Sequence, residues 1–358
     1  MRKTILSLIL LSIFVYADPV CEGVDVEKVK KLYEKETKDI SYWFEGNNVL
    51  CKPVVKGNEA LVFILYRQGE DDNYGVSLAI ALYDGQKEQV VKHFFIEDYA
   101  DSDAYFIRDI VFDVKTFSSI SPYPSFSSIV EKSGSSQVNP FSHKNITIYE
   151  FKEEKLNKLF ETTLEEVSGE NNGNDVGEIS FKKSKYMGIK SSKVYPDLTF
   201  ENSYEYRYYN EKTEQNWKVN YGKRLFVYRE GKYELVNKNL PKLFDLKKIE
   251  EQTKKGLKFK SVVLRALMKE EWVNKKNVES FNNIAYYLSK SGHDKEAVVV
   301  LENIIHSFPK RTVAYYNLAD AYWTSGKKKK ARDMYDVYVK QRKSEGLSVP
   351  KKVLGRLK

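Results

Sequence analysis

The sequence predicts an α+β fold, in which an N-terminal helix plus an antiparallel β-sheet domain is followed by an all-α helical repeat domain. Three observations lead to this prediction. Residues 278–345 carry one pattern twice, at a spacing of 34 residues. Between Leu50 and about Val236, short apolar runs alternate with turn residues, and no helical period separates them. A chain of 358 residues is also long enough to bury two hydrophobic cores.

The repeated pattern places polar, small and turn-forming residues at equivalent positions. The matched pairs are Asn283 with Asn317, Ala285 with Ala319, Ser291 with Ser325, Gly292 with Gly326, and Ala297 with Ala331. A self-match of this period is typical of an array of helix–turn–helix units. Glycine is expected where the first helix ends, because it adopts a left-handed cap at the lowest cost. Alanine is expected where two helices cross at close range.

The stretch from Ala314 to Tyr322, followed by Gly326 and Ala331, resembles the consensus of the tetratricopeptide repeat family. The resemblance covers about 70 of the 358 residues. It implies a scaffold that binds a protein or a peptide, and it leaves the identity of the partner open. Two repeats alone would be marginally stable, so capping segments are expected on both sides of the array.

Lys258 stands where a third repeat would carry glycine, so the segment before the repeats is expected to connect and cap. A short closing helix is expected at Pro350–Leu357. The expected organisation is a signal peptide at 1–17, a helix plus antiparallel β domain at 18–239, connecting and capping helices at 240–277, two tetratricopeptide repeats at 278–345 and a C-terminal capping segment at 346–358.

The resemblance implies a binding groove lined by the outward face of the first helix of each repeat. The residues on that face are Glu279, Asn282, Tyr286, Lys290, Tyr316, Asp320 and Trp323. The family's clamp for a C-terminal carboxylate needs a lysine and an asparagine there, and the matching positions do not carry that pair. Aromatic side chains with mixed charge suit a folded partner. They equally suit packing of Tyr286, Tyr316 and Trp323 on a neighbouring domain of the same chain.

The N-terminal residues have the pattern of a secretory signal peptide. Arg2 and Lys3 precede an apolar run, and the segment Val15-Tyr-Ala17 offers the small residues that predict a cut after Ala17. The run is too short to span a bilayer comfortably, and no later stretch is longer, so no membrane span is expected. The protein is therefore expected to be periplasmic or secreted. In such a compartment, the isolated pair Cys21 and Cys51 predicts a disulfide.

The expected elements of the first domain begin with an amphipathic helix at Asp25–Ile40, with Asp25 as its N-cap. Serine and proline between Ser118 and Phe141 predict a long surface loop. Strands are expected at Ala60–Tyr66, Val76–Tyr83, Val90–Ile96, Phe106–Val114, Asn145–Phe151, Leu156–Glu166, Glu178–Met187, Thr199–Tyr209, Asn216–Tyr221, Leu225–Tyr228 and Tyr233–Val236.

Tyr204, Tyr206 and Tyr208 alternate with Glu205 and Arg207, which places three phenols on one strand face and an ion pair on the other. Such a row of tyrosines (the tyrosine row) can stack on sugars, but it is more often a half-buried sheet face.

The sequence contains few motifs that are typical of catalytic sites. The four histidines lack metal-ligand spacing, and no phosphate loop or nucleophile elbow is present. Asp101 and Asp103 lie between expected strands and could act as paired carboxylates, but acidic residues are also common in turns. Neither a cofactor nor a metal is expected, and the chain is not expected to be an enzyme.

Charge divides the chain. Residues 251–358 hold 24 Lys and Arg and 11 Asp and Glu, a net charge of +13, whereas residues 18–250 carry −6. This asymmetry indicates an interaction, and the basic repeats suit an acidic partner. Nucleic acid is not expected, because an exported protein rarely meets it. The expected function is an exported, non-enzymatic protein-binding scaffold of the cell envelope. The alternatives are an inhibitor or immunity-type protein that blocks an envelope-acting enzyme, and a peptidoglycan- or glycan-acting protein.

Overall fold

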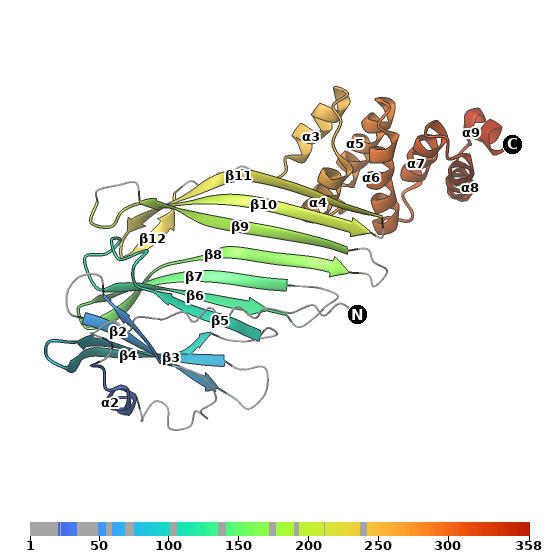
Figure 1. Cartoon of the computed structure of the whole chain (residues 1–358). Coiled ribbons are helices and arrows are strands. Elements are labelled where there is room, and N and C mark those ends of the chain that lie inside the picture. Colours follow the sequence, from blue (N-terminus) through green and yellow to red (C-terminus); the bar gives the residue numbers. More distant parts are fainter. Residues whose placement is uncertain are drawn as a thin grey trace, which may run out of the picture.

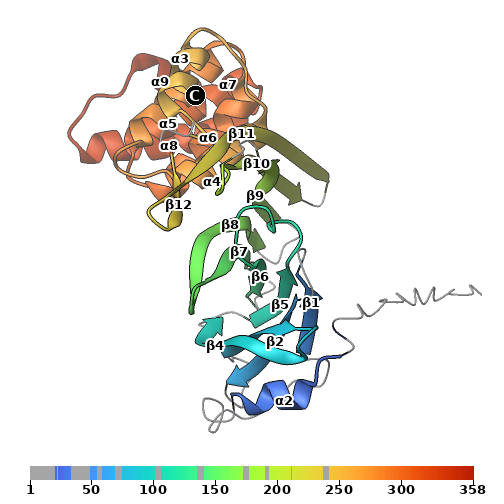
Figure 2. The ribbon, with the colours of Figure 1, turned by 90° about the vertical axis from the view of Figure 1, so that its left-hand side faces the viewer.

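The computed structural model describes residues 21, 23–33, 49–54, 59–68, 75–100, 106–134, 141–171, 177–189, 193–210, 212–236 and 242–358. These residues form an α+β fold with an N-terminal helix, antiparallel sheets and a C-terminal run of helices, which confirms the predicted fold class. The N-terminal helix and the C-terminal helices lie at opposite ends of the molecule, with the sheets between them (Figure 1, Figure 2). The predicted signal peptide lies outside the described residues.

The described strands form a small and a large antiparallel sheet. The small sheet has the order β1-β2-β3-β4, with β1 Val49–Pro53, β2 Glu59–Gln68, β3 Gly75–Asp84 and β4 Gln89–Ala100. The large sheet runs from β12 to β5 in reverse sequence order, with β5 Phe106–Asp113, β6 Ser125–Ser133, β7 Phe141–Lys152, β8 Lys155–Asn171, β9 Gly177–Ile189, β10 Leu198–Asn210, β11 Thr213–Arg229 and β12 Lys232–Leu235. Each strand of the large sheet pairs with its neighbour in sequence, so this sheet is a continuous meander.

Helix α2, Val26–Lys31, covers one face of the small sheet. The Asp25 side chain caps its N-terminus, as predicted. Tyr33, two residues after the helix, is buried, and its hydroxyl donates a hydrogen bond to the carbonyl of Ile80 in β3 at 2.6 Å. Residues 34–40 of the predicted helix lie outside the described part of the chain.

The predicted disulfide between Cys21 and Cys51 is present, with the two Cα atoms 5.7 Å apart. Closing a loop of this length stabilises a fold by roughly 3 kcal/mol in the chain-entropy model. Such bonds persist in oxidising compartments, so the bond fits a protein outside the cytoplasm. Of the helices in the described ranges, none is long and apolar enough to cross a membrane.

The part of the large sheet formed by β5 to β8 is covered on both faces. On one face, Phe63 of β2 stacks on Phe112 of β5 with 4.1 Å between ring centroids, so the small sheet packs there. On the other face, Phe117 and Ile120 of the segment between β5 and β6 pack with Ile148 of β7. This end of the large sheet therefore lies between the small sheet and the segment that connects β5 to β6.

The predicted surface loop at Ser118–Phe141 is wrong, because Ser125–Ser133 within it form strand β6. This strand pairs with β5 on one side and with β7 on the other. Ser125, Ser127 and Ser128 are buried although serine is typical of turns. Pairing on both sides satisfies the backbone of β6, and this tertiary context overrides the local preference.

The two expected strands Asn216–Tyr221 and Leu225–Tyr228 form the single strand β11. Its pairing with β10 shifts in register next to Gly222, which has a backbone φ of 153°. A β-bulge with glycine interrupts the side-chain alternation without ending the strand. The sequence therefore shows two alternating runs where the structure has one bulged strand.

The C-terminal part is a row of helices that leads away from the large sheet (Figure 1). They are α3 Leu246–Lys254, α4 Ser261–Glu271, α5 Val278–Lys290, α6 Asp294–Ser307, α7 Thr312–Thr324, α8 Lys328–Ser344 and α9 Lys351–Leu357. Helices α5 with α6 and α7 with α8 occupy the two sequence repeats. Helix α9 is the predicted closing helix.

Helices α5 and α7 end in the same capping motif. Gly292 and Gly326 have φ of 78° and 81°, and the following N–H bonds to the carbonyl five residues back, at 2.8 and 2.9 Å. This is the Schellman motif, which glycine favours. Helix α3 ends the same way at Gly256, with a φ of 84° and a bond of 3.0 Å from Leu257. The cap that a strict 34-residue period places at Lys258 thus occurs two residues earlier.

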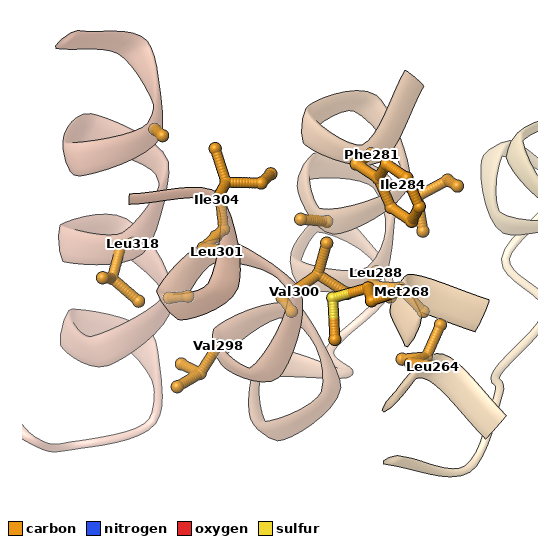
Figure 3. Close-up of a cluster of buried hydrophobic side chains, with 14 of the residues drawn as sticks. Leu264, Met268, Phe281, Ile284, Leu288, Val298, Val300, Leu301, Ile304 and Leu318 are labelled. Carbon is orange, nitrogen blue, oxygen red and sulfur yellow. The ribbon is translucent and has the colours of Figure 1, made fainter. Parts of the chain in front are cut away.

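One continuous core holds the array together. Figure 3 shows side chains from four helices converging in it, among them Leu264 of α4, Phe281 of α5, Leu301 of α6 and Leu318 of α7. Ala285, Ala297, Ala319 and Ala331 are all fully buried in this core. A methyl group at these positions allows the close approach of neighbouring helices that the sequence pattern predicts.

Replacing Ala319 by leucine is expected to lower the free energy of unfolding by about 1–3 kcal/mol, because the larger side chain overpacks this contact. Ser325 is exposed at the adjacent turn. Its replacement by alanine is expected to change the free energy by less than about 0.5 kcal/mol. Chemical denaturation of both variants measures the difference. Equal losses would show that the alanine does not lie in a tight helix contact.

Candidate functional site

The tyrosine row of β10 joins the large sheet to the helices. Tyr204 and Tyr206 are fully buried and belong to the same hydrophobic cluster as the core of the array. Tyr208 is only partly buried, and the guanidinium of Arg265 in α4 lies 4.1 Å from its ring centroid. This is a favourable cation–π contact. The row is therefore a packing face on which α4 is mounted.

Two ion pairs flank the buried tyrosines. The Lys269 ammonium of α4 lies 2.9 Å from the Glu178 carboxylate of β9, and Lys182 of β9 lies 3.0 Å from Glu270 of α4. Each of these carboxylates also accepts a hydrogen bond from a buried tyrosine hydroxyl. Burial, together with the Glu178 carboxylate, raises the pKa of Tyr206 far above its ordinary value, so this hydroxyl remains a donor.

The tyrosine row is thus not a sugar-stacking surface, since two of its three rings are covered by helices. The predicted ion pair on the other strand face is present, with 2.6 Å between Arg207 Nε and the Glu205 carboxylate. Asp101 and Asp103, the carboxylates considered for catalysis, lie outside the described residues. In the part of the chain that is described, no group of three or more His, Cys, Asp or Glu is placed to hold a metal ion.

The predicted groove residues of α5 separate into one buried and three open side chains. Asn282 is buried, and its side-chain oxygen accepts a hydrogen bond from the Asn317 amide of α7 at 3.2 Å. It therefore joins two helices and is not available to a ligand. Glu279, Tyr286 and Lys290 are exposed, and the Lys290 ammonium lies 5.7 Å from the Tyr286 ring centroid.

The predicted groove residues of α7 contact the closing helix α9. The Asp320 carboxylate forms ion pairs with Lys352 at 2.7 Å and Arg356 at 2.6 Å. The Arg356 guanidinium lies 4.8 Å from the Trp323 ring centroid, and the Lys352 ammonium lies 5.8 Å from that of Tyr316. Two of the three aromatic side chains thus contact the closing helix of the same array rather than a neighbouring domain, and of the three only Tyr286 is exposed.

One exposed residue escaped the prediction. Val313 of α7 is 43% exposed, and Tyr286 of α5 is 41% exposed. Val313 lies 34 residues after Glu279, so it is the second-repeat equivalent of a predicted groove residue. Applying the period to every groove position finds it from sequence alone. Glu279, Tyr286, Lys290 and Val313 are the exposed residues at the predicted groove positions and their repeat equivalents, and we call this set the open half-groove.

No model of a known protein family matches this chain, and a search of curated proteins finds no relative. The resemblance to tetratricopeptide repeats therefore stays a prediction that rests on the sequence pattern.

Replacing Asp320 by alanine is expected to release α9, because it removes both ion pairs to this helix. Hydrogen exchange of the amides of residues 354–357 should accelerate, and the free energy of unfolding should fall by about 1–2 kcal/mol. Asp333 of α8 is exposed and has no ion pair to a described residue, so Asp333→Ala is the matched control. Unchanged exchange in Asp320→Ala would mean that other contacts hold α9 in place.

Proposed function

We propose that the chain is an exported, non-enzymatic scaffold of the cell envelope that binds a protein partner through its helical array. The observation that carries this proposal is the open half-groove, in which Tyr286 and Val313 are exposed together with Glu279 and Lys290. The aromatic residues Tyr316 and Trp323 of α7 contact Lys352 and Arg356 of α9, so one part of the face is closed and the other is open.

The chemistry of the open half-groove suits a protein surface. A tyrosine buries a large amphipathic area at low cost in conformational entropy, and such residues often dominate interface energetics. The charges of Glu279 and Lys290 at its margin suit a polar rim. Because α5 is packed between its neighbours, little ordering of the groove is needed on binding, and this favours affinity.

Export is supported by the N-terminal sequence and the disulfide. Arg2 and Lys3 followed by an apolar run favour secretion, with cleavage after Ala17. The bond between Cys21 and Cys51 forms in oxidising surroundings such as the periplasm. We therefore place the protein in the periplasm or outside the cell.

Photo-crosslinking tests the proposal directly. A benzoylphenylalanine residue in place of Tyr286 should capture a discrete protein in cells that express the chain naturally. The same residue in place of Tyr123, which is 37% exposed on the sheet domain, should not capture it. Capture from both positions, or from neither, would contradict a binding role for the open half-groove.

With the captured partner in hand, Tyr286→Ala is expected to weaken its affinity about 30-fold, which corresponds to about 2 kcal/mol for an aromatic anchor. The change should lie mainly in the dissociation rate and depend little on salt, because the contact is desolvated rather than ionic. Surface plasmon resonance at two salt concentrations measures both rates. Tyr123→Ala serves as the control, and equal affinities for the two variants would sink the idea.

A further inference from the structure

A second cleft lies where the helices meet the large sheet, away from the open half-groove. It is formed by the tip of the β10–β11 hairpin, by α4 and α6, and by the turn between α7 and α8. Its volume is about 400 Å³. Ligand sites in proteins commonly enclose about 300–1,000 Å³, so this cleft is large enough for a ligand with several functional groups.

Positive charge dominates this cleft. Four cations line it, each from a different place in the chain: Arg265 of α4, Lys295 of α6, Lys327 of the α7–α8 turn and Lys330 of α8. The one carboxylate among the lining residues is that of Glu302, which gives the lining a net charge of +3. This carboxylate already accepts a hydrogen bond from the Tyr322 hydroxyl.

None of the four cations forms an ion pair with a carboxylate in the described part of the chain. Three of them lie close to aromatic rings instead. Arg265 lies over the Tyr208 ring, and the ammonium groups of Lys327 and Lys330 lie 5.8 and 5.5 Å from the Tyr322 ring centroid. Ring contacts orient a cation but do not neutralise it. The aromatic rings therefore leave the positive charge of the cleft uncompensated.

The rest of the lining combines apolar and hydrogen-bonding groups. Val298 and Val299 of α6 contribute apolar surface. Asn210 and Gln215 of the hairpin contribute amides, which can both donate to and accept from a peptide backbone. An inorganic anion has no apolar part and would leave the valines unused. A sulfated or phosphorylated polysaccharide has few apolar groups as well.

We infer that this junction cleft binds an acidic peptide segment of a partner protein, with carboxylates on the four cations and an aliphatic side chain on the valines. The site does not depend on the open half-groove, and it adds a second contact surface to the array. A partner that engages both surfaces would gain affinity by multivalency. Electrostatic attraction would mainly speed association and would be screened at physiological salt, where the Debye length is about 8 Å.

Fluorescence anisotropy with the purified mature chain tests the inference. The probe is a short labelled peptide of alternating glutamate and leucine. It should bind saturably at low ionic strength, and much more weakly when salt is raised. The same peptide with glutamine for glutamate, or with alanine for leucine, should bind more weakly, because it lacks either the charges or the apolar side chains.

The double variant Lys327→Glu with Lys330→Glu is expected to weaken probe binding by about tenfold or more. The matched control is Lys310→Glu with Lys340→Glu. These lysines are exposed on the same array and do not line the cleft, so the change in net charge is identical. The control variant and Tyr286→Ala should both retain probe binding, which separates this site from the open half-groove. Circular dichroism verifies that each variant remains folded.

Several results would overturn the inference. Equal losses in the double variant and its control would show attraction to overall charge, with no specific cleft. Tighter binding of a sulfated oligosaccharide than of the peptide would assign the cleft to anionic glycans. Loss of probe binding in Tyr286→Ala would place the peptide in the open half-groove instead. Absence of saturable binding would remove the site altogether.

Discussion

Burial of Tyr204 and Tyr206 between β10 and α4 is the interaction on which the arrangement of the protein depends. These rings belong to the hydrophobic core of the helical array although they lie on a strand of the sheet. Burying an aromatic side chain of this size contributes on the order of 2 kcal/mol, and the ion pairs from Glu178 and Glu270 fix the orientation of α4. The array is thereby mounted on the sheet as one body, and the junction cleft exists only because of this mounting.

Much of the fold can be predicted from the sequence, because residues with the same structural role recur at a fixed spacing. Gly292 and Gly326 mark helix ends at a fixed spacing, and their left-handed backbone shows why glycine is required there. Strand β6 cannot be predicted from the sequence, because serines such as Ser125 and Ser127 are typical of turns. They form a strand only because β6 pairs with two neighbouring strands. The repeat period also fails to predict the helix cap at Gly256, because the turn before α4 is longer than the period allows.

The candidate sites are less predictable, because they depend on which segments meet in space. The repeat pattern identifies Tyr286 and Asp320 as equivalent outward positions, but it cannot show that α9 pairs with Asp320 and leaves Tyr286 open. The junction cleft gathers cations from separate elements and the tip of a distant hairpin. In the sequence, only the run Lys327–Lys330 signals it, and a basic run is usually a solvated face.

A distance measurement between the large sheet and the helical array tests most directly whether the array is held rigidly on the sheet. Spin labels at Asn220 of β11 and Lys340 of α8, both exposed, can be read by double electron–electron resonance, since the native cysteines are bonded to each other. A rigid mounting through the tyrosine row predicts a single narrow distance distribution in the purified chain. A broad or bimodal distribution would show that the array moves freely relative to the sheet, and it would contradict the account.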